Sequence, residues 1–143
     1  MSKPHLILVV DDDHEDVELF KEALHEINPG ITCVSAENGK CALHILKEME
    51  VYPDYIFLDL NMPCLNGKQC LAKIKETNQL LHIPVIIYST SDAPSDIYDT
   101  KKLGASYFLT KPSSFEDIKS AISSILNMKL HPGSTLYKSV LVL

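Results

Sequence analysis

Long apolar runs are absent from this 143-residue chain. No stretch approaches the roughly 18 consecutive apolar residues that a membrane-spanning helix requires. The N-terminus also lacks the charged, apolar and small-residue regions of a signal peptide. We therefore expect a cytoplasmic protein without a membrane partner.

A surplus of positive charge is absent as well. Lys and Arg together number 13, against 19 Asp and Glu, and the net charge is −6. A chain of this charge is repelled by phosphate backbones, so nucleic acid is not an expected partner.

The cysteines have neither C-x-x-C spacing nor the Cys/His pattern of a zinc site. We expect four reduced thiols in a reducing compartment rather than a disulfide framework. The six histidines show no ligand spacing either and are expected at the surface or at strand ends. The cysteines are Cys33, Cys41, Cys64 and Cys70.

The length fits one domain, which at this size buries about two thirds of its unfolded surface. There is no internal repeat and no low-complexity linker. Residues 1–128 are expected to form the domain, and residues 129–143, with the helix-breaking Pro132-Gly133, an apolar tail that is not a separate domain. Three roles stay open for the tail: packing on its own domain, pairing with a partner or with a second copy as a homodimer, or being the remnant of a longer protein.

Short apolar runs, several rich in β-branched residues, alternate with helical patterns along the chain. Such runs are typical of strands that are buried on both faces of a sheet. They lie at Leu6–Val10, Ile31–Ser35, Tyr55–Leu58, Val85–Tyr88 and Tyr107–Leu109. Apolar residues at helical spacing predict a helix after each run, the fourth being marked only by Ile97 and Leu103. Five β/α units imply an α/β fold with a parallel sheet covered by helices on both faces, because a closed eightfold barrel would need roughly twice this length.

Two of the predicted helices begin with capping signals. Asp13 could cap the first helix, and the negative charge of Asp16 would interact favourably with the positive, N-terminal end of the helix dipole. Ser113 or Ser114 could cap the fifth helix in the same way.

Polar side chains follow four of the five predicted strands. The segments are Asp11-Asp12-Asp13, Asp59, Ser89-Thr90-Ser91 and Thr110-Lys111-Pro112. In open α/β sheets the active crevice lies beyond the carboxyl ends of the strands, so these side chains should meet at one edge. Acids that repel one another are stable there only with a cation or with raised pKa values. Carboxylates suit Mg²⁺, and a metal, an ammonium and a free carboxylate together suit phosphoryl transfer onto an aspartate.

At these residues the chain resembles the receiver domain of two-component response regulators. Val9-Val10-Asp11-Asp12 is similar to the acidic pair of that family, and Asp59-Leu60-Asn61-Met62-Pro63, with Gly67 downstream, resembles its phosphoacceptor turn. Ser89 and Lys111-Pro112 match the ends of the fourth and fifth strands. The resemblance covers about residues 5 to 128, with the motifs in order. It implies a flavodoxin-like, doubly wound sheet of five parallel strands in the order 2-1-3-4-5, with five helices.

The resemblance also implies a role for the acidic residues. Asp59 would accept a phosphoryl group from a histidine kinase or a histidine phosphotransfer protein. Asp12, Asp59 and the backbone carbonyl of Asn61 would bind Mg²⁺ directly, and Asp11 mostly through water. Asp13 extends the acidic pair, but a helix cap explains it without a metal.

Three further residues take roles from the same resemblance. Lys111 would pair with Asp59 and then with a phosphoryl oxygen, and the Lys111-Pro112 peptide is often cis in the family. Ser89 would hydrogen-bond the phosphoryl group and move when it arrives. Phe108 stands where the family keeps an aromatic whose rotamer follows that movement, although a core position explains Phe108 equally well.

The sequence thus predicts a phosphorylation switch rather than an enzyme that acts on other substrates, signalling through a downstream protein because no output segment is expected. Two alternatives are considered. One is a receiver-like docking module that takes no phosphate, which the complete set of site residues disfavours. The other is a small phosphatase of the aspartyl-phosphate type. Such enzymes usually carry a second acid two residues after the nucleophile, and here that position is Asn61.

Overall fold

The computed structural model describes residues 4–128 of the chain. The predicted tail at 129–143 lies outside the described residues, so its three possible roles stay predictions. Within residues 4–128, no helix combines the length and the apolar character that crossing a bilayer would require.

Five strands alternate with five helices in the described part of the chain. The strands are β1 (Leu6–Val10), β2 (Thr32–Ala36), β3 (Tyr55–Leu58), β4 (Val85–Ser89) and β5 (Tyr107–Thr110). The helices are α1 (His14–Ile27), α2 (Gly39–Glu48), α3 (Gly67–Glu76), α4 (Pro94–Lys102) and α5 (Phe115–Asn127). Each predicted strand agrees with the observed one to within a residue at either end.

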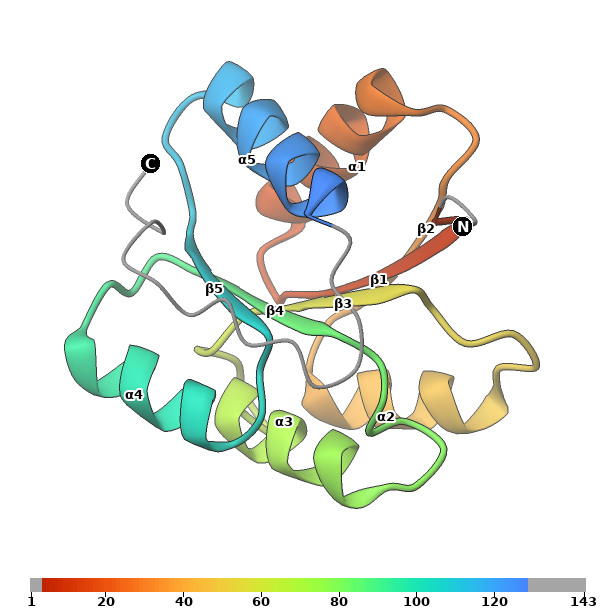
Figure 1. Cartoon of the computed structure of the whole chain (residues 1–143), viewed down its shortest axis with the longest axis vertical. Coiled ribbons are helices and arrows are strands. Elements are labelled where there is room, and N and C mark those ends of the chain that lie inside the picture. The colour runs from red at the N-terminus through yellow and green to blue at the C-terminus, as the bar shows by residue number, and fades with distance from the viewer. Residues whose placement is uncertain (1–3, 129–143) are drawn as a thin grey trace.

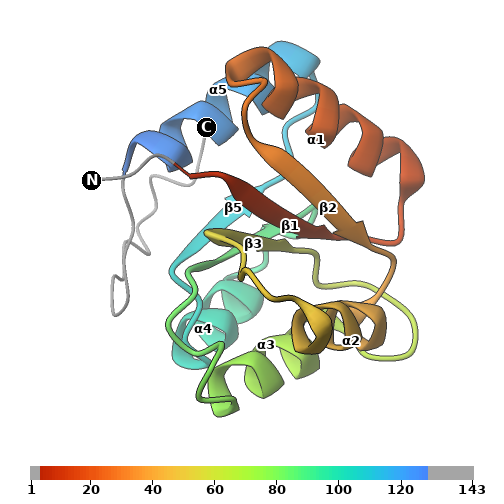
Figure 2. The ribbon, with the colours of Figure 1, turned by 90° about the vertical axis from the view of Figure 1, so that its right-hand side faces the viewer.

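The strands form one parallel sheet in the order β2-β1-β3-β4-β5, as the resemblance implies. Helices α1 and α5 cover one face of this sheet, and α2, α3 and α4 cover the other (Figures 1 and 2). The predicted doubly wound α/β fold is therefore confirmed. Its carboxyl edge gathers the loops that leave all five strands.

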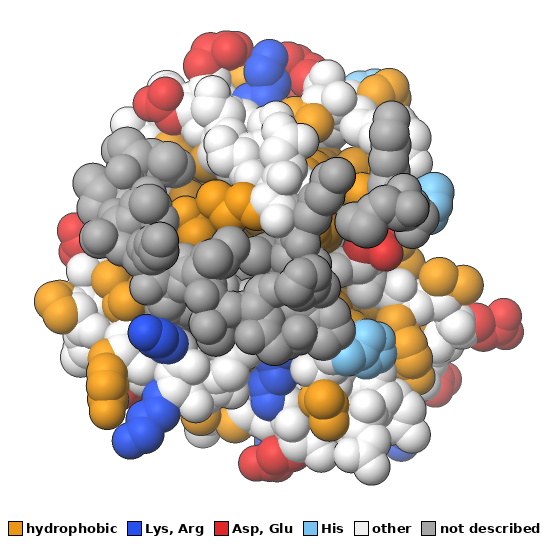
Figure 3. Space-filling view, viewed as in Figure 1, with side chains coloured by type: hydrophobic (Ala, Val, Ile, Leu, Met, Phe, Trp, Pro, Cys, Tyr) orange, Lys and Arg blue, Asp and Glu red, His pale blue; other side chains and the backbone are white. Residues whose placement is uncertain are grey.

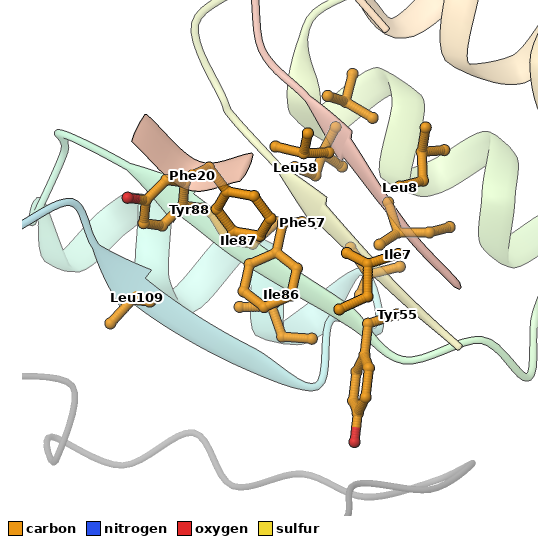
Figure 4. Close-up of a cluster of buried hydrophobic side chains, with 14 of the residues drawn as sticks. Ile7, Leu8, Phe20, Tyr55, Phe57, Leu58, Ile86, Ile87, Tyr88 and Leu109 are labelled. Atoms are coloured by element: carbon orange, nitrogen blue, oxygen red, sulfur yellow. The ribbon is translucent and has the colours of Figure 1, made fainter. Parts of the chain in front are cut away.

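An aromatic cluster fixes α1 on the sheet. The ring of Phe20 on α1 lies 4.8 Å from that of Phe57 on β3 and 5.7 Å from that of Tyr88 on β4, both in edge-on geometry (Figure 4). All three side chains are buried. Because burial of one large apolar side chain contributes about 1.5–3 kcal/mol, this contact holds the first turn of α1 beside the carboxyl edge.

The predicted helix caps are present. The Asp13 carboxylate accepts a hydrogen bond from the Asp16 N–H at 3.1 Å and caps α1. Of the two candidate serines before α5, Ser114 is the cap, accepting from the Asp117 N–H at 3.1 Å. Asp13 is therefore the N-cap of α1, as its position in the sequence predicts.

Large exposed hydrophobic side chains are few and separate in the described residues. They are Leu19, Val51, Leu81, Tyr98 and Met128. On the face shown in Figure 3, the hydrophobic side chains over α3 and α4 lie among lysine and polar side chains. Single exposed hydrophobic residues are normal on a protein surface and do not by themselves mark a binding site.

Lys75 on α3 binds the backbone of the segment that connects α3 to β4. Its ammonium donates hydrogen bonds to the carbonyl oxygens of Leu81 at 2.9 Å and Ile83 at 2.8 Å. Burial lowers the pKa of this ammonium. The side chain thus satisfies two carbonyls that no strand or helix bond reaches.

We expect Lys75→Met to lower the free energy of unfolding by about 1–2 kcal/mol, because two carbonyl oxygens lose their donor. Urea denaturation measures the change. Lys73→Met, an exposed lysine on the same helix, is the control and should stay within about 0.5 kcal/mol of the parent. Equal midpoints for the two variants would contradict the structural role of Lys75.

Candidate functional site

Strand register brings the two acidic segments together. β1 and β3 pair with Val10 opposite Leu58, so Asp11 and Asp59 leave adjacent strands at the same level. The Asp59 N–H donates to the Val10 carbonyl at 2.9 Å, and the Asp11 N–H donates to the Ala36 carbonyl at 3.0 Å. Backbone pairing therefore extends one residue beyond each strand and fixes both acids at the carboxyl edge.

Asp11, Asp12 and Asp59 form an acid cluster. One carboxylate oxygen from each lies within 4.8 Å of the others. Asp11 and Asp59 are 3% and 6% exposed, whereas Asp12 faces solvent. Burial and the nearby Asp11 charge raise the pKa of Asp59 to about 6, although Lys111 opposes the shift. The expected meeting of the strand-end acids is therefore confirmed. The raised pKa of Asp59 has the direction expected for a buried acid beside another acid.

Lys111 follows β5 and reaches into this cluster. Its Nζ lies 2.7 Å from Asp11 Oδ2, 2.8 Å from Asp16 Oδ2 and 3.9 Å from Asp59 Oδ2. Burial alone would lower the pKa of Lys111, but the close contacts of its ammonium with the Asp11 and Asp16 carboxylates outweigh burial and raise it. The ammonium is thus firmly charged and is shared among three acids.

Asp16 is the residue that the sequence did not indicate as part of the site. The sequence predicts only that its charge interacts favourably with the positive N-terminal end of α1, and Asp16 does lie in the first turn. A second signal was available, since α1 begins directly after the acidic segment. An acid in its first turn can therefore face the same edge as Asp11.

The Lys111-Pro112 peptide departs from the expected cis form. No peptide bond is cis in the described residues, so this one is trans, the form that X–Pro bonds favour by about 0.5–1 kcal/mol. Lys111 still reaches the acids because its N–H donates to the Ser89 carbonyl at 2.7 Å, which extends the pairing of β4 with β5.

Ser89 is the strand-end hydroxyl at the cluster. It is the last residue of β4 and is fully buried. Its side chain makes a hydrogen bond with Asp59, which lowers the pKa of Asp59 and partly offsets the rise that burial causes. Thr90 is exposed, and Ser91 instead donates to Asp96 Oδ2 at 2.5 Å. The Ser91 N–H donates to Ser89 Oγ at 3.3 Å, which links the loop after β4 to the cluster.

Phe108 lies in the core and outside the acid cluster. Its side chain is 0% exposed. The next residue, Leu109, lies opposite Tyr88 on β4, and the Tyr88 side chain faces α1, so Leu109 faces α1 as well. Since side chains alternate along a strand, Phe108 faces the opposite side of the sheet, where α4 lies. Its burial agrees with the core interpretation, and its predicted movement stays a prediction.

The turn after Asp59 is built tightly against α3. Asp59 Oδ1 accepts from the Leu60 N–H at 2.9 Å, and the Gly67 N–H donates to the Leu60 carbonyl at 3.0 Å. Asn66 and Gln69 form a capping box at the start of α3. A Cβ on Gly67 would lie only 2.2 Å from the Asp59 carbonyl oxygen, so no other residue fits without a shift of the backbone.

An open depression of about 530 Å³ lies beside the acid cluster. It is lined by Asp12, Leu60, Asn61, Met62, Pro63, Asn66, Lys68 and Asp96. Lys68 lies 2.8 Å from Asp96 and 2.9 Å from Asp99, and thereby links α3 to α4 at the rim. A ligand that approaches Asp12 from solvent would enter here.

The residues present fit a hard divalent cation. Three carboxylate oxygens converge, and oxygen is the ligand that Mg²⁺ prefers. Asp11 Oδ2 is buried without a well-aligned hydrogen-bond donor and has only the ion pair with Lys111. A single ammonium does not balance the charge of Asp11, Asp12, Asp16 and Asp59 together, so an added cation would relieve the remaining repulsion.

Comparison with known proteins agrees with this geometry. The model of the response regulator receiver domain family matches residues 7–123. The chain belongs to the response regulator receiver family. It is therefore a receiver-type response regulator of two-component signalling, a family of signalling switches in which phosphorylation and binding of Mg²⁺ or Mn²⁺ at the acidic pocket are typical.

Relatives of the receiver span bacteria and plants. Response regulator Rcp1 of Synechocystis sp. is 30% identical over 129 residues, which cover 87% of this chain and 88% of that protein. Two-component response regulator ORR8 of Oryza sativa is 36% identical over 118 residues, covering 82% and 94%. The crystal structure of the phosphorylated cyanobacterial phytochrome response regulator RcpA aligns with a TM-score of 0.82 and 28% identity, covering 92% of this chain and all of that one. The Mn²⁺-bound form of Rcp1 aligns with a TM-score of 0.79, 28% identity and 91% coverage of this chain.

Proposed function

We propose that this receiver accepts a phosphoryl group on Asp59, in a Mg²⁺-dependent reaction, from a histidine kinase or a histidine phosphotransfer protein. The observation that carries the proposal is the convergence of Asp11, Asp12 and Asp59 with Lys111 at one strand edge. Output would then pass through contacts with a downstream protein.

The transfer step uses the carboxylate of Asp59 as the nucleophile. One of its oxygens attacks the phosphorus of a phosphohistidine and forms an O–P bond, while the P–N bond breaks and its electron pair goes to the imidazole nitrogen. The ammonium of Lys111, 3.9 Å from Asp59, would then donate to a phosphoryl oxygen, and the buried Ser89 hydroxyl would donate to another.

Four residues would hold the cation. Asp12, Asp59 and the backbone carbonyl of Asn61 are the proposed direct ligands, and Asp11 would act through water. Asp12 and Asn61 both line the open depression, whereas Asp11 is buried and paired with Lys111, which suits a less direct role. When bound, Mg²⁺ would neutralise charge on the phosphoryl oxygens.

The proposal is tested by incubating the protein with a small phosphodonor and Mg²⁺. Intact-protein mass spectrometry should show one added phosphoryl group, stable in acid and labile in base, as expected for an acyl phosphate. The group should not appear when EDTA removes the metal. Labelling that persists in EDTA would contradict the metal requirement, and no labelling with any phosphodonor would favour the docking module that takes no phosphate.

We expect Mg²⁺ affinity to fall when the pH is lowered from neutral, because protonated Asp59 is not an anionic ligand. The raised pKa of about 6 for Asp59 places the loss near that pH. Between pH 7.5 and pH 5.5, affinity should weaken by about three- to fivefold, measured by calorimetry. Asp59→Asn should bind more weakly and lose this pH dependence. Equal wild-type affinity at both pH values would contradict the assignment of Asp59 as a ligand.

A further inference from the structure

The ammonium of Lys111 lies at unequal distances from its three neighbouring acids. Asp11 and Asp16, at 2.7 Å and 2.8 Å, are within hydrogen-bond distance of Nζ. Asp59, at 3.9 Å, is too far for a hydrogen bond and keeps only the charge interaction. The Lys111 ammonium, which is proposed to donate to the phosphoryl group on Asp59, is therefore bound to Asp11 and Asp16 in this structure.

Asp16 is held in place by the helix that carries it. Its N–H donates to the Asp13 side chain, and one turn later Phe20 packs on Phe57 and Tyr88. The Lys111 ammonium lies 5.7 Å from the centre of the Tyr88 ring. Lys111 is only 8% exposed and Asp16 is 33% exposed, so the ion pair is shielded from solvent mainly on the lysine side.

We propose that Asp16 is a positioning residue, which holds Lys111 away from Asp59 in the unphosphorylated receiver and competes with the phosphoryl oxygens for its ammonium. This inference rests on the proposed function of Asp59. A phosphoryl group brings about −1.5 to −2 charges and several acceptor oxygens. To donate to one of them, Lys111 must move toward Asp59 and weaken its bond to Asp16, which limits how tightly the phosphoryl group is held.

Beryllofluoride, an analogue of the phosphoryl group, tests the competition in the presence of Mg²⁺. Asp16→Asn keeps the shape of the side chain and removes its charge, and we expect it to bind beryllofluoride about three- to tenfold more tightly than wild type. Glu15→Gln is the matched control. It makes the same charge change in the same helical turn at an exposed residue without an ion pair in the described part of the chain, and its affinity should stay within about twofold of wild type.

Two further measurements separate positioning from a merely structural role. Asp16→Glu, which keeps the charge, should restore affinity close to that of wild type. Crystal structures of wild type should show the Lys111–Asp16 bond without the analogue and its loss when beryllofluoride and Mg²⁺ are bound. This second comparison needs no variant, so it decides the question even if Asp16→Asn fails to fold.

The outcomes distinguish the inference from the function on which it rests. If wild type neither binds beryllofluoride nor takes up phosphoryl, the proposed function fails and the role of Asp16 fails with it. If wild type binds but Asp16→Asn and Glu15→Gln bind equally, only the role of Asp16 is overturned. Retention of the Lys111–Asp16 bond in the bound state would overturn it as well.

Discussion

Asp59→Asn is expected to abolish phosphoryl uptake and to stabilise the protein at the same time. The amide that replaces the carboxylate is not a competent nucleophile, so mass spectrometry should find no adduct under conditions that label wild type. Stability should rise because burial and the Asp11 charge destabilise the ionised side chain, as the raised pKa of about 6 indicates.

The sign of the stability change follows from linkage. A carboxyl group whose pKa is higher in the folded than in the unfolded protein disfavours folding once pH rises above the unfolded value, and the cost is complete above about pH 6. Removal of the charge at pH 7.5, without metal, should therefore raise the free energy of unfolding by about 1–3 kcal/mol. Urea denaturation in EDTA measures this gain.

Asp92→Asn provides the matched control for both measurements. Asp92 is exposed in the loop after β4, close in sequence to Ser89 and Ser91 but outside the acid cluster. It should label normally and change stability by no more than about 0.5 kcal/mol. Undiminished labelling of Asp59→Asn would remove Asp59 as the acceptor, and a loss of stability would show that its charge is favourable in the fold.

Gly67→Ala is expected to lower the free energy of unfolding by about 3 kcal/mol, because the added Cβ cannot be accommodated. It would lie 2.2 Å from the Asp59 carbonyl oxygen and 2.6 Å from Leu60 Cα, both of them backbone atoms. Gly67 does not have a positive φ in this structure, so the loss would be steric and not conformational. Relief requires α3 or the turn after Asp59 to shift, and labelling of Asp59 should fall as well.

Gly30→Ala is the comparison for this effect. Its Cβ would approach Asn28 Oδ1 at 3.1 Å, a side-chain atom that accepts from the Gly30 N–H at 2.9 Å and needs to shift by only a few tenths of an ångström. We expect a change of less than about 1 kcal/mol in urea denaturation and normal labelling. Similar losses in the two variants would mean that close packing of α3 on the phosphoacceptor turn is not what requires glycine at position 67.

Element boundaries show where local sequence stops being informative. The prediction included Ile31 in the second strand because it is apolar, yet its N–H donates to the Asn28 carbonyl at 3.1 Å and belongs to the turn. The polar Ser89 and Thr110 extend β4 and β5 by one residue each, because they pair with one another. Backbone pairing depends on the neighbouring strand, which an apolar pattern in one strand does not describe.

The sequence itself determined the succession of strands and helices along the chain, the capping by Asp13 and the convergence of Asp11, Asp12 and Asp59 at one edge. Each depends on local periodicity, or on the rule that parallel strands end at one edge. The order of the strands within the sheet followed only from the resemblance to receiver domains. The ion pair between Lys111 and Asp16 was decided only by the tertiary structure, because the two residues lie 95 positions apart in the chain. Their contact depends on how Phe20 packs α1 against β3 and β4, and no spacing along the sequence encodes that packing.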